Sequence, residues 1–238
     1  LDADGLPGAM GNRIAAITGR PVGLIFMQGF QSIPFQSGDR IKLRRDPLDL
    51  KHLIPYKSLK NAPSLMDDYK QLASIDPGNK YYNANVKNYI GAWKKYWGEE
   101  IPELMKTKSV LDGESWGAYP ELAGSVTTKA GQAYNVLTSA FGPGCYKSII
   151  FLSSENMFEG EKAANFDSEF SVLANSWKDH FSDKDTPLFY TIPSKSLSPK
   201  VAAPKSIKGK STAVEISDWA DTATIEKLID AAAKATSK

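Results

Sequence analysis

The sequence predicts an α/β domain with a mostly parallel sheet. Short apolar runs rich in strand-forming residues alternate along the chain with longer segments in which apolar residues recur every three or four positions. This alternation is typical of parallel strands joined by right-handed crossovers, with helices covering both faces of the sheet. The 238 residues, of which 42% are apolar, are enough to form one core, so we expect a single domain.

Six segments have the apolar spacing of helices. They are 7–18, 64–73, 83–97, 132–140, 166–181 and 224–234. We expect the first segment to end before Gly19 and Pro21, because both residue types are common just after a helix. In the third segment the apolar residues of one predicted helix face are Val86, Tyr89, Ile90, Trp93 and Trp97.

Four short apolar runs predict buried strands. They are 22–27, 148–153, 187–192 and 212–216. These runs contain the β-branched and aromatic residues that favour strands. The stretches 29–55 and 104–126 have no clear period, and 193–210 consists mainly of Ser, Pro, Ala and Lys, so we expect loops there.

The composition excludes several classes of protein. Twenty-nine Lys and Arg balance 27 Asp and Glu without a dense basic block, so nucleic acid is not an expected partner. The single cysteine, Cys145, excludes an internal disulfide and a Cys-rich metal site. No zinc-ligand cluster, phosphate-binding glycine loop or metal-binding acidic array occurs, so we expect neither a metal nor another cofactor. The longest apolar run, 22–27, is far shorter than the roughly 20 residues of a membrane span, which argues against an integral membrane protein.

The start of the chain bears on localisation. Its first residue is Leu, and residues 1–5 have neither the charged start nor the apolar stretch of a signal peptide. We therefore expect a processed or a truncated chain. Processing would suit export, or import into the lumen of an organelle, as a soluble or peripherally associated protein.

Several blocks of sequence follow one another in a recognisable order. Residues 13–25 end in Gly-Arg-Pro-Val-Gly-Leu-Ile, and residues 134–156 include Tyr-Asn-Val, Phe-Gly-Pro and Lys-Ser-Ile-Ile-Phe-Leu-Ser-Ser-Glu-Asn. Leu-Ala-Asn-Ser-Trp at 173–177, Thr-Pro-Leu-Phe-Tyr-Thr-Ile at 186–192 and the run 213–221 come after them. Together these blocks resemble the sialate O-acetylesterases of the SGNH hydrolase superfamily.

The resemblance implies a fold. The implied fold is an SGNH-hydrolase-like, flavodoxin-like three-layer α/β sandwich with a mostly parallel sheet. It would form one domain over residues 1–238. The strand that opens the family's domain would be lost, or would precede Leu1. Residues 36–130 match only loosely and would be a divergent insertion.

The resemblance also implies where a catalytic site would be. SGNH esterases use a serine nucleophile, a histidine base with a nearby aspartate, and an oxyanion hole completed by Gly and Asn groups. The serine turn would lie upstream of residues 21–25, where this chain has no serine. In place of the family's Gly-Gly pair the chain has Gln28, Gly29, Phe30 and Gln31, of which Gln28, Gly29 and Gln31 are candidate donors. The bulk of Phe30 favours a structural loop.

Two further blocks hold candidate remnants of the site. The family's Gln-Gly-Glu-Ser-Asn corresponds to residues 153–157, where Glu155 is a candidate and Asn156 would take the place of the oxyanion donor. The family's terminal Asp-x-x-His would begin at Asp218 or at Asp221, and neither alignment supplies a histidine. Without that base a serine hydroxyl stays protonated, and nucleophilic catalysis falls by orders of magnitude.

Three residues elsewhere are candidates for the missing catalytic groups. His180 ends a predicted helix, where an imidazole is favourable because of the helix dipole. His52 lies in the loosely matching region, and Ser115 belongs to a Gly-Glu-Ser sequence that comes after the first block instead of before it. None of them completes a triad within this chain.

We therefore predict a non-catalytic SGNH-like protein that acts as a structural or interaction subunit of a larger assembly and binds other protein chains. Trp93, Trp97 and Trp116 are the candidate contact residues. The alternative is an active carbohydrate O-acetylesterase whose serine lies outside this chain and whose base is His52. A third hypothesis is a lectin-like module that binds carbohydrate in the former cleft.

Overall fold

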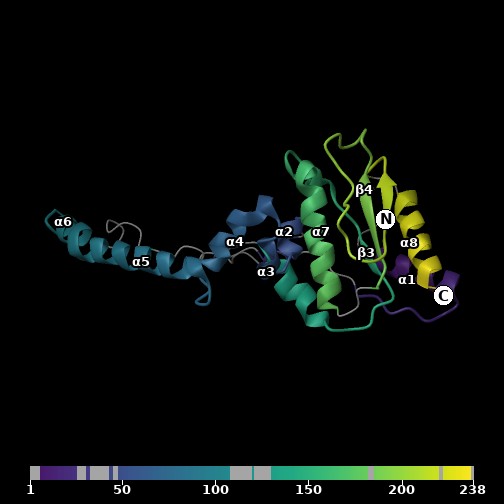
Figure 1. Ribbon diagram of the computed structural model, residues 1–238, viewed down its shortest axis with the longest axis horizontal. Coiled ribbons are helices and arrows are strands. Elements are labelled where there is room, and N and C mark those ends of the chain that lie inside the picture. Colours follow the sequence, from purple (N-terminus) through teal and green to yellow (C-terminus); the bar gives the residue numbers. More distant parts are fainter. Residues whose placement is uncertain are drawn as a thin grey trace.

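The computed structural model describes residues 6–25, 31–32, 43–44, 48–107, 120, 130–181, 185–219 and 222–236. It has the predicted α/β character: helices pack around a parallel sheet, and a further group of helices extends away from it (Figure 1). We call the sheet with its covering helices the body.

The sheet of the body has three parallel strands in the order β3-β4-β5. They are β3 (Ile149–Phe151), β4 (Leu188–Pro193) and β5 (Ser211–Ile216). The central strand β4 is buried along its whole length, which explains its continuous apolar sequence. Three of the four predicted strands are therefore confirmed.

The strand predicted at 22–27 is not formed over its described part. Val22 to Ile25 have no strand structure, and the side chains of Leu24 and Ile25 are 41% and 45% exposed. An apolar run becomes a strand only where a neighbouring strand takes up its backbone hydrogen bonds, and here the run follows α1 (Leu6–Thr18) without such a neighbour. Residues 26 and 27 lie outside the described part of the chain.

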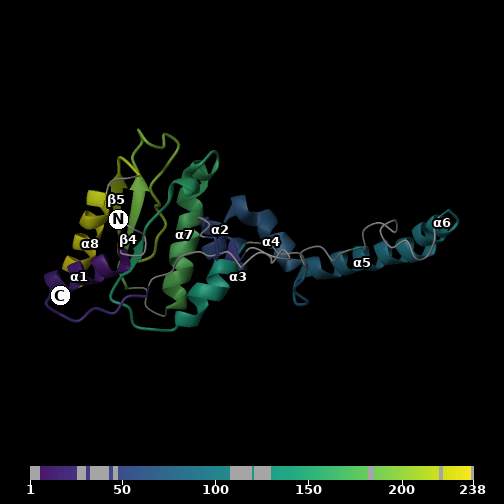
Figure 2. The same cartoon turned by 180° about the vertical axis from the view of Figure 1, so that it is seen from behind.

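Helices cover both faces of the sheet (Figure 2). On one face, α7 (Lys162–His180) places the Phe170 ring 4.7 Å from the Tyr190 ring and 5.0 Å from the Phe151 ring. On the other face, Leu228 of α8 (Thr222–Thr236) packs with Phe189. Phe189 and Tyr190 are neighbours in β4, and their side chains point to opposite faces because strand residues alternate.

Helix α1 packs against α8. Met10 and Ile14 meet Ile229 in a small apolar cluster, and the Arg13 guanidinium donates two hydrogen bonds to Asp230, of 2.5 and 2.8 Å. The two ends of the described chain therefore lie next to each other on one face of the sheet.

Both crossovers of the sheet lie on the α7 face. The first is α7 itself, and the second is the loop 194–210, as predicted a segment without helix or strand. Asn175 and Lys178 of α7 donate to backbone carbonyl groups of this loop, and Lys178 is completely buried. Each strand is added on the same side of the previous one, from β3 to β4 to β5, and both connections lie on the same face of the sheet. The two crossovers therefore have the same hand.

The other helical segments belong mainly to the predicted insertion. They are α2 (Leu50–Leu53), α3 (Tyr56–Leu59), η1 (Pro63–Leu65), α4 (Met66–Ala73), α5 (Lys80–Lys95), η2 (Tyr96–Glu100), α6 (Ile101–Met105), η4 (Tyr134–Thr138), η5 (Ser139–Phe141) and η6 (Glu155–Phe158). All six predicted helical segments are helical in the structure. A short antiparallel pair, β1 (Gln31–Ser32) and β2 (Leu43–Arg44), completes the described elements.

We call α5, η2 and α6 the arm, because they extend far from the sheet (Figures 1 and 2). Asn79 caps α5 by accepting a hydrogen bond from the Tyr81 backbone N–H, so the helix begins earlier than its apolar period predicts. Asn79 also donates to the Tyr69 hydroxyl, and Asn85 donates to the Ser74 carbonyl. These bonds fix the base of the arm to α4.

None of the helices in the described part of the chain has the length and apolar character that a membrane span requires.

Candidate functional site

The candidate site lies at the carboxyl edge of the parallel sheet, where open α/β sheets bind their ligands. Residues 153–156 follow β3, Ser194 follows β4 and Asp218 follows β5. The Trp219 ring lies 5.6 Å from the Phe158 ring, which joins the segments after β5 and β3. The structure thus brings the predicted residues Glu155, Asn156 and Asp218 to one edge.

The side chain of Asn156 is fully engaged in hydrogen bonds. Its amide nitrogen donates to Asp49 Oδ1 at 2.8 Å and to the Leu48 carbonyl at 3.3 Å. Its amide oxygen accepts from the Ser154 hydroxyl at 2.5 Å. Both amide hydrogens therefore point to the segment before α2 and not to the open edge of the sheet.

Asp49 is the centre of this network. The Lys162 ammonium lies 3.1 Å from both Asp49 carboxylate oxygens and 3.1 Å from the Asn156 carbonyl oxygen. Asp49 is also the N-cap residue of α2. One carboxylate thus connects the insertion, the end of β3 and the start of α7.

His52 lies next to this network, but its hydrogen bond has the wrong direction for a triad base. Its Nδ1 atom accepts a hydrogen bond from the Asp49 backbone N–H at 3.2 Å. In a Ser-His-Asp triad, Nδ1 carries the proton and donates it to the carboxylate. An acceptor at Nδ1 places the proton of the neutral ring on Nε2, which leaves that atom unable to take a proton from serine.

The two serines that follow β3, Ser153 and Ser154, are held by structural hydrogen bonds. The Ser153 hydroxyl lies 2.8 Å from both the carbonyl oxygen and the hydroxyl of Thr191, and the Ser154 hydroxyl donates to Asn156. Within the part of the chain that the structure describes, neither hydroxyl is hydrogen-bonded to a histidine. Neither serine therefore has the partner that would activate it.

A second carboxyl group near Asp49 was missed by the sequence analysis. Glu169 of α7 is only 8% exposed and accepts a 2.7 Å hydrogen bond from the Ser64 hydroxyl. Burial raises the pKa of Glu169, and the charge of Asp49 adds to that effect, whereas Ser64, Lys162 and Lys51 oppose it. Its spacing of three positions from Phe166 and four from Leu173, both on the inward face of α7, was the available signal.

The other predicted residues belong to different parts of the chain and differ in exposure. Glu155 and Asp218 are exposed. Gln31 pairs with Arg44 in the β1–β2 ladder, and its side chain lies outside the described part of the structure. Trp93 is half-buried and stacks on Trp97, which is 50% exposed. The remaining predicted residues lie outside the described ranges: Gln28, Gly29, Trp116 and Asp221.

His180 is part of the packing near the end of α7. Its ring lies 5.5 Å from the Tyr134 ring and 5.2 Å from the Phe181 ring, and a methyl group added at Gly142 would overlap it. It is at the opposite end of α7 from Lys162, so it cannot serve the carboxyl edge.

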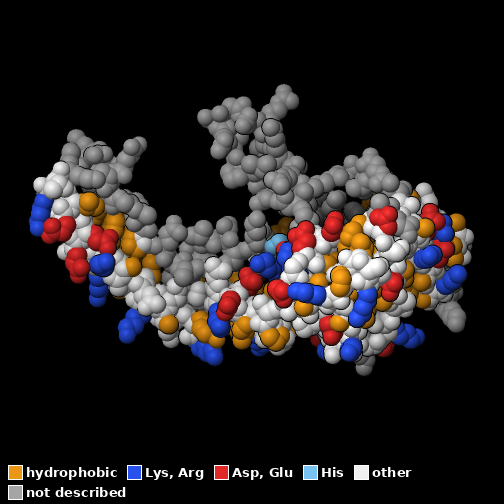
Figure 3. Space-filling view, turned by 90° about the horizontal axis from the view of Figure 1, so that it is seen from above, with side chains coloured by type: hydrophobic (Ala, Val, Ile, Leu, Met, Phe, Trp, Pro, Cys, Tyr) orange, Lys and Arg blue, Asp and Glu red, His pale blue; other side chains and the backbone are white. Residues whose placement is uncertain are grey.

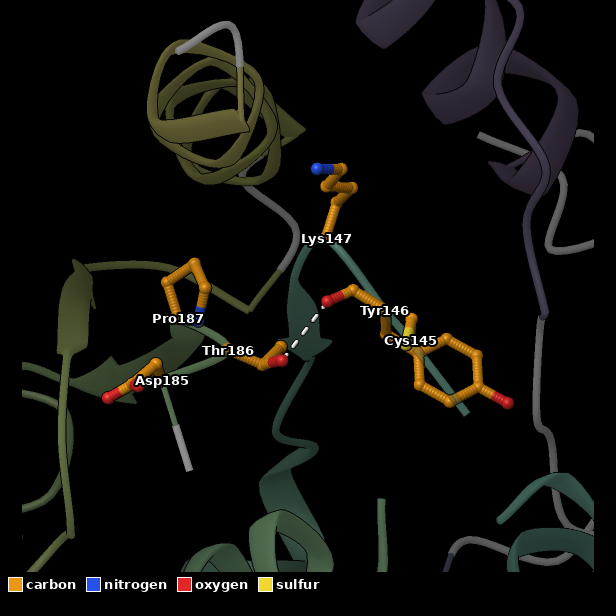
Figure 4. A pocket seen from close by; sticks show the side chains of 6 residues that line it. All are labelled: Cys145, Tyr146, Lys147, Asp185, Thr186 and Pro187. Atoms are coloured by element: carbon orange, nitrogen blue, oxygen red, sulfur yellow. Dashed lines mark hydrogen bonds between the residues drawn. The ribbon is translucent and has the colours of Figure 1, made fainter. Parts of the chain in front are cut away.

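A shallow pocket lies at the other end of the sheet. It is formed where the chain enters β3 and β4, and Thr186 donates a 3.0 Å hydrogen bond to the Tyr146 carbonyl across it (Figure 4). The lining residues are Cys145, Tyr146, Lys147, Asp185, Thr186 and Pro187. Since this pocket lies at the amino ends of the strands, it is separate from the Asn156 network.

The described residues contain no group of three or more His, Cys, Asp or Glu side chains arranged to hold a metal ion.

Comparison with known proteins finds no matching family model, no matching curated protein and no matching solved structure. The resemblance to sialate O-acetylesterases therefore stays a prediction.

Proposed function

We propose that this chain is a non-catalytic, SGNH-hydrolase-like protein that serves as an interaction subunit of a larger assembly. One observation carries the proposal. Asn156, which the resemblance assigns to the oxyanion hole, gives both amide hydrogens to Leu48 and Asp49.

An oxyanion donor works only if its hydrogen points to the charge that develops in the transition state. Loss of one such donor lowers kcat by about 100-fold to 1,000-fold. To free Asn156, its hydrogen bond to the Asp49 carboxylate must break, and hydrogen bonds to charged groups contribute about 1.5–3 kcal/mol. The Lys162 ion pair holds Asp49 in place and opposes that rearrangement.

The surrounding groups support the same proposal. A nucleophilic serine needs a base that accepts its proton and a carboxylate that stabilises the resulting imidazolium. The Asp49 carboxylate faces Asn156 and Lys162, whereas His52 Nδ1 faces the Asp49 backbone N–H. The polar groups stabilise the carboxyl edge instead of preparing it for chemistry.

The arm supplies the surface for interaction. Trp97 is half-exposed on a helix that projects from the body, and aromatic residues of this kind are enriched at protein interfaces. A fold that keeps its core and extends a helix with a half-exposed tryptophan is suited to binding another chain.

Hydrolysis of a small aryl acetate tests the proposal. The assay uses this chain and, separately, the full translated product with any residues encoded before Leu1. We expect no turnover above the buffer rate, and the same rate for the Asn156→Ala variant. Turnover by either protein that Asn156→Ala lowers 100-fold would contradict the proposal and favour the active esterase.

A further inference from the structure

The arm carries three exposed apolar side chains at regular intervals. Ile90, Trp97 and Met105 are 48%, 50% and 52% exposed. Seven positions separate the first two and eight separate the last two, and η2 lies in the second interval. Since a π turn takes up about one residue more than an α turn, each interval makes about two turns. The three side chains therefore lie on one side of the arm, with Trp97 in the middle.

This apolar strip is distinct from the buried side of the arm. Tyr96 and Ile101 are 2% and 4% exposed, whereas each of the three side chains of the strip is about half-exposed. The Trp97 ring stacks on the Trp93 ring at 6.2 Å with an angle of 14°. A ring already held in this way loses little conformational freedom when a partner covers it.

The charges of the arm change sign at the strip's centre. The basic end, residues 80–95, has four lysines and no acidic residue, and the acidic end, residues 96–105, has three glutamates and no basic residue. All seven side chains belong to exposed residues, and Figure 3 shows charged and hydrophobic side chains mixed over the arm. They are Lys80, Lys87, Lys94, Lys95, Glu99, Glu100 and Glu103.

We propose that two copies of this chain associate through their arms, antiparallel, about a two-fold axis at Trp97. The apolar strip is symmetric about that residue, so Ile90 of one copy faces Met105 of the other and the two Trp97 rings meet. The charges are antisymmetric, so each basic end lies along an acidic end, whereas a parallel pairing would set lysines against lysines. This inference rests on the proposed interaction role and names the partner as a second copy.

Charge reversal at the axis tests the arrangement. Sedimentation equilibrium compares the full chain with two double variants. Lys94→Glu/Lys95→Glu has an arm that is acidic around the axis. Glu99→Lys/Glu100→Lys has an arm that is basic around the axis. We expect the unaltered chain to form a dimer. Each variant alone should dissociate about tenfold more readily or worse, because like charges meet. An equimolar mixture of the two variants should form a heterodimer.

Lys195→Glu/Lys205→Glu is the matched control for Lys94→Glu/Lys95→Glu. It makes the same change in charge at two exposed residues of the loop 194–210. It should dimerise like the unaltered chain, and circular dichroism should show equal helix content in all variants. A monomeric unaltered chain, variants that dimerise normally, or a mixture that stays monomeric would overturn the inference. Ester hydrolysis by a dimeric protein would instead refute only the proposed lack of catalysis.

Discussion

Asp49 is the residue on which the hydrogen bonds at the carboxyl edge of the sheet converge. It accepts from Asn156 and pairs with Lys162, which lie 107 and 113 positions away in the chain. Its side chain is 23% exposed, so solvent replaces these partners only in part when they are lost. Asp49 thus joins the insertion to the body.

Asp49→Ala should lower the free energy of unfolding by about 1–3 kcal/mol, because Asn156 and Lys162 lose a charged partner at a partly buried position. Urea denaturation measures the change. Asp67→Ala is the matched control, since the Asp67 side chain is 95% exposed and its ion pair with Lys70 is on the surface. The control should change stability by no more than about 0.5 kcal/mol, and an equal effect of both variants would refute the role of Asp49.

Glu169 makes stability depend on pH in a direction opposite to that of most carboxyl groups. Its pKa is raised in the folded protein, chiefly by burial, so the folded state holds the proton more tightly than the unfolded state. Between the ordinary pKa and the raised one, stability due to this group falls as pH rises. Above the raised pKa the full cost of the buried charge is present.

Glu169→Gln should therefore be more stable than the unaltered protein at pH 7, because the amide keeps an acceptor for Ser64 without the charge. The gain should shrink as pH falls through the raised pKa and vanish below the ordinary pKa of 4.5. Urea denaturation of both proteins from pH 7 to pH 4 measures the difference. A gain that does not change with pH would contradict the assigned cause.

At the scale of elements, the buried lysine of α7 fixes the second crossover. Lys178 Nζ donates to the carbonyl oxygens of Lys208 and Lys210, directly before β5. The Lys210 carbonyl also accepts from the Leu188 backbone N–H, whereas Lys208 O has Lys178 as its donor. The hydrogen bonds of this one side chain thus hold the loop against α7, whereas a crossover helix would be held by packing.

Lys178→Met keeps the volume of the side chain but removes both donors, and we expect it to cost about 1–3 kcal/mol of unfolding free energy. Thermal and urea unfolding measure this loss. The control Lys208→Met removes an exposed lysine that pairs with Asp179 on the surface, and it should change stability by less than about 0.5 kcal/mol. If the two variants behave alike, Lys178 does not hold the loop.

The elements were predictable to the extent that their patterns are local. The periodic apolar faces predicted all six helical segments, and β4 was predictable because burial on both faces makes its sequence continuously apolar. The run at 22–27 is also continuously apolar, but an apolar sequence does not show whether a neighbouring strand is present. Leu24 and Ile25 are exposed for that reason.

At the scale of the whole molecule, the carboxyl edge was predictable only in part. Asn156 was found because it follows a predicted strand within a recognisable block, and Glu155 and Asp218 for the same reason. Its partners Asp49 and Lys162 lie in other elements, and no sequence spacing reports a contact across more than 100 residues. The closed network therefore emerged only from the fold.

The direction of the arm likewise could not be predicted from the sequence. Helical periodicity predicted a helix with Trp93 and Trp97, but an amphipathic helix that packs on its own core has the same pattern. In the structure the helix leads away from the sheet (Figure 1), and Ile90 and Trp97 are about half-exposed.

Labelling with a serine-directed fluorophosphonate, read by intact mass, tests the lack of catalysis most directly. The reagent adds one mass increment to a protein with an activated serine and none to a protein without one. We expect the folded chain to show no increment, because Ser153 and Ser154 are held by Thr191 and Asn156. Stoichiometric labelling of a single serine, lost on unfolding the protein, would contradict the account.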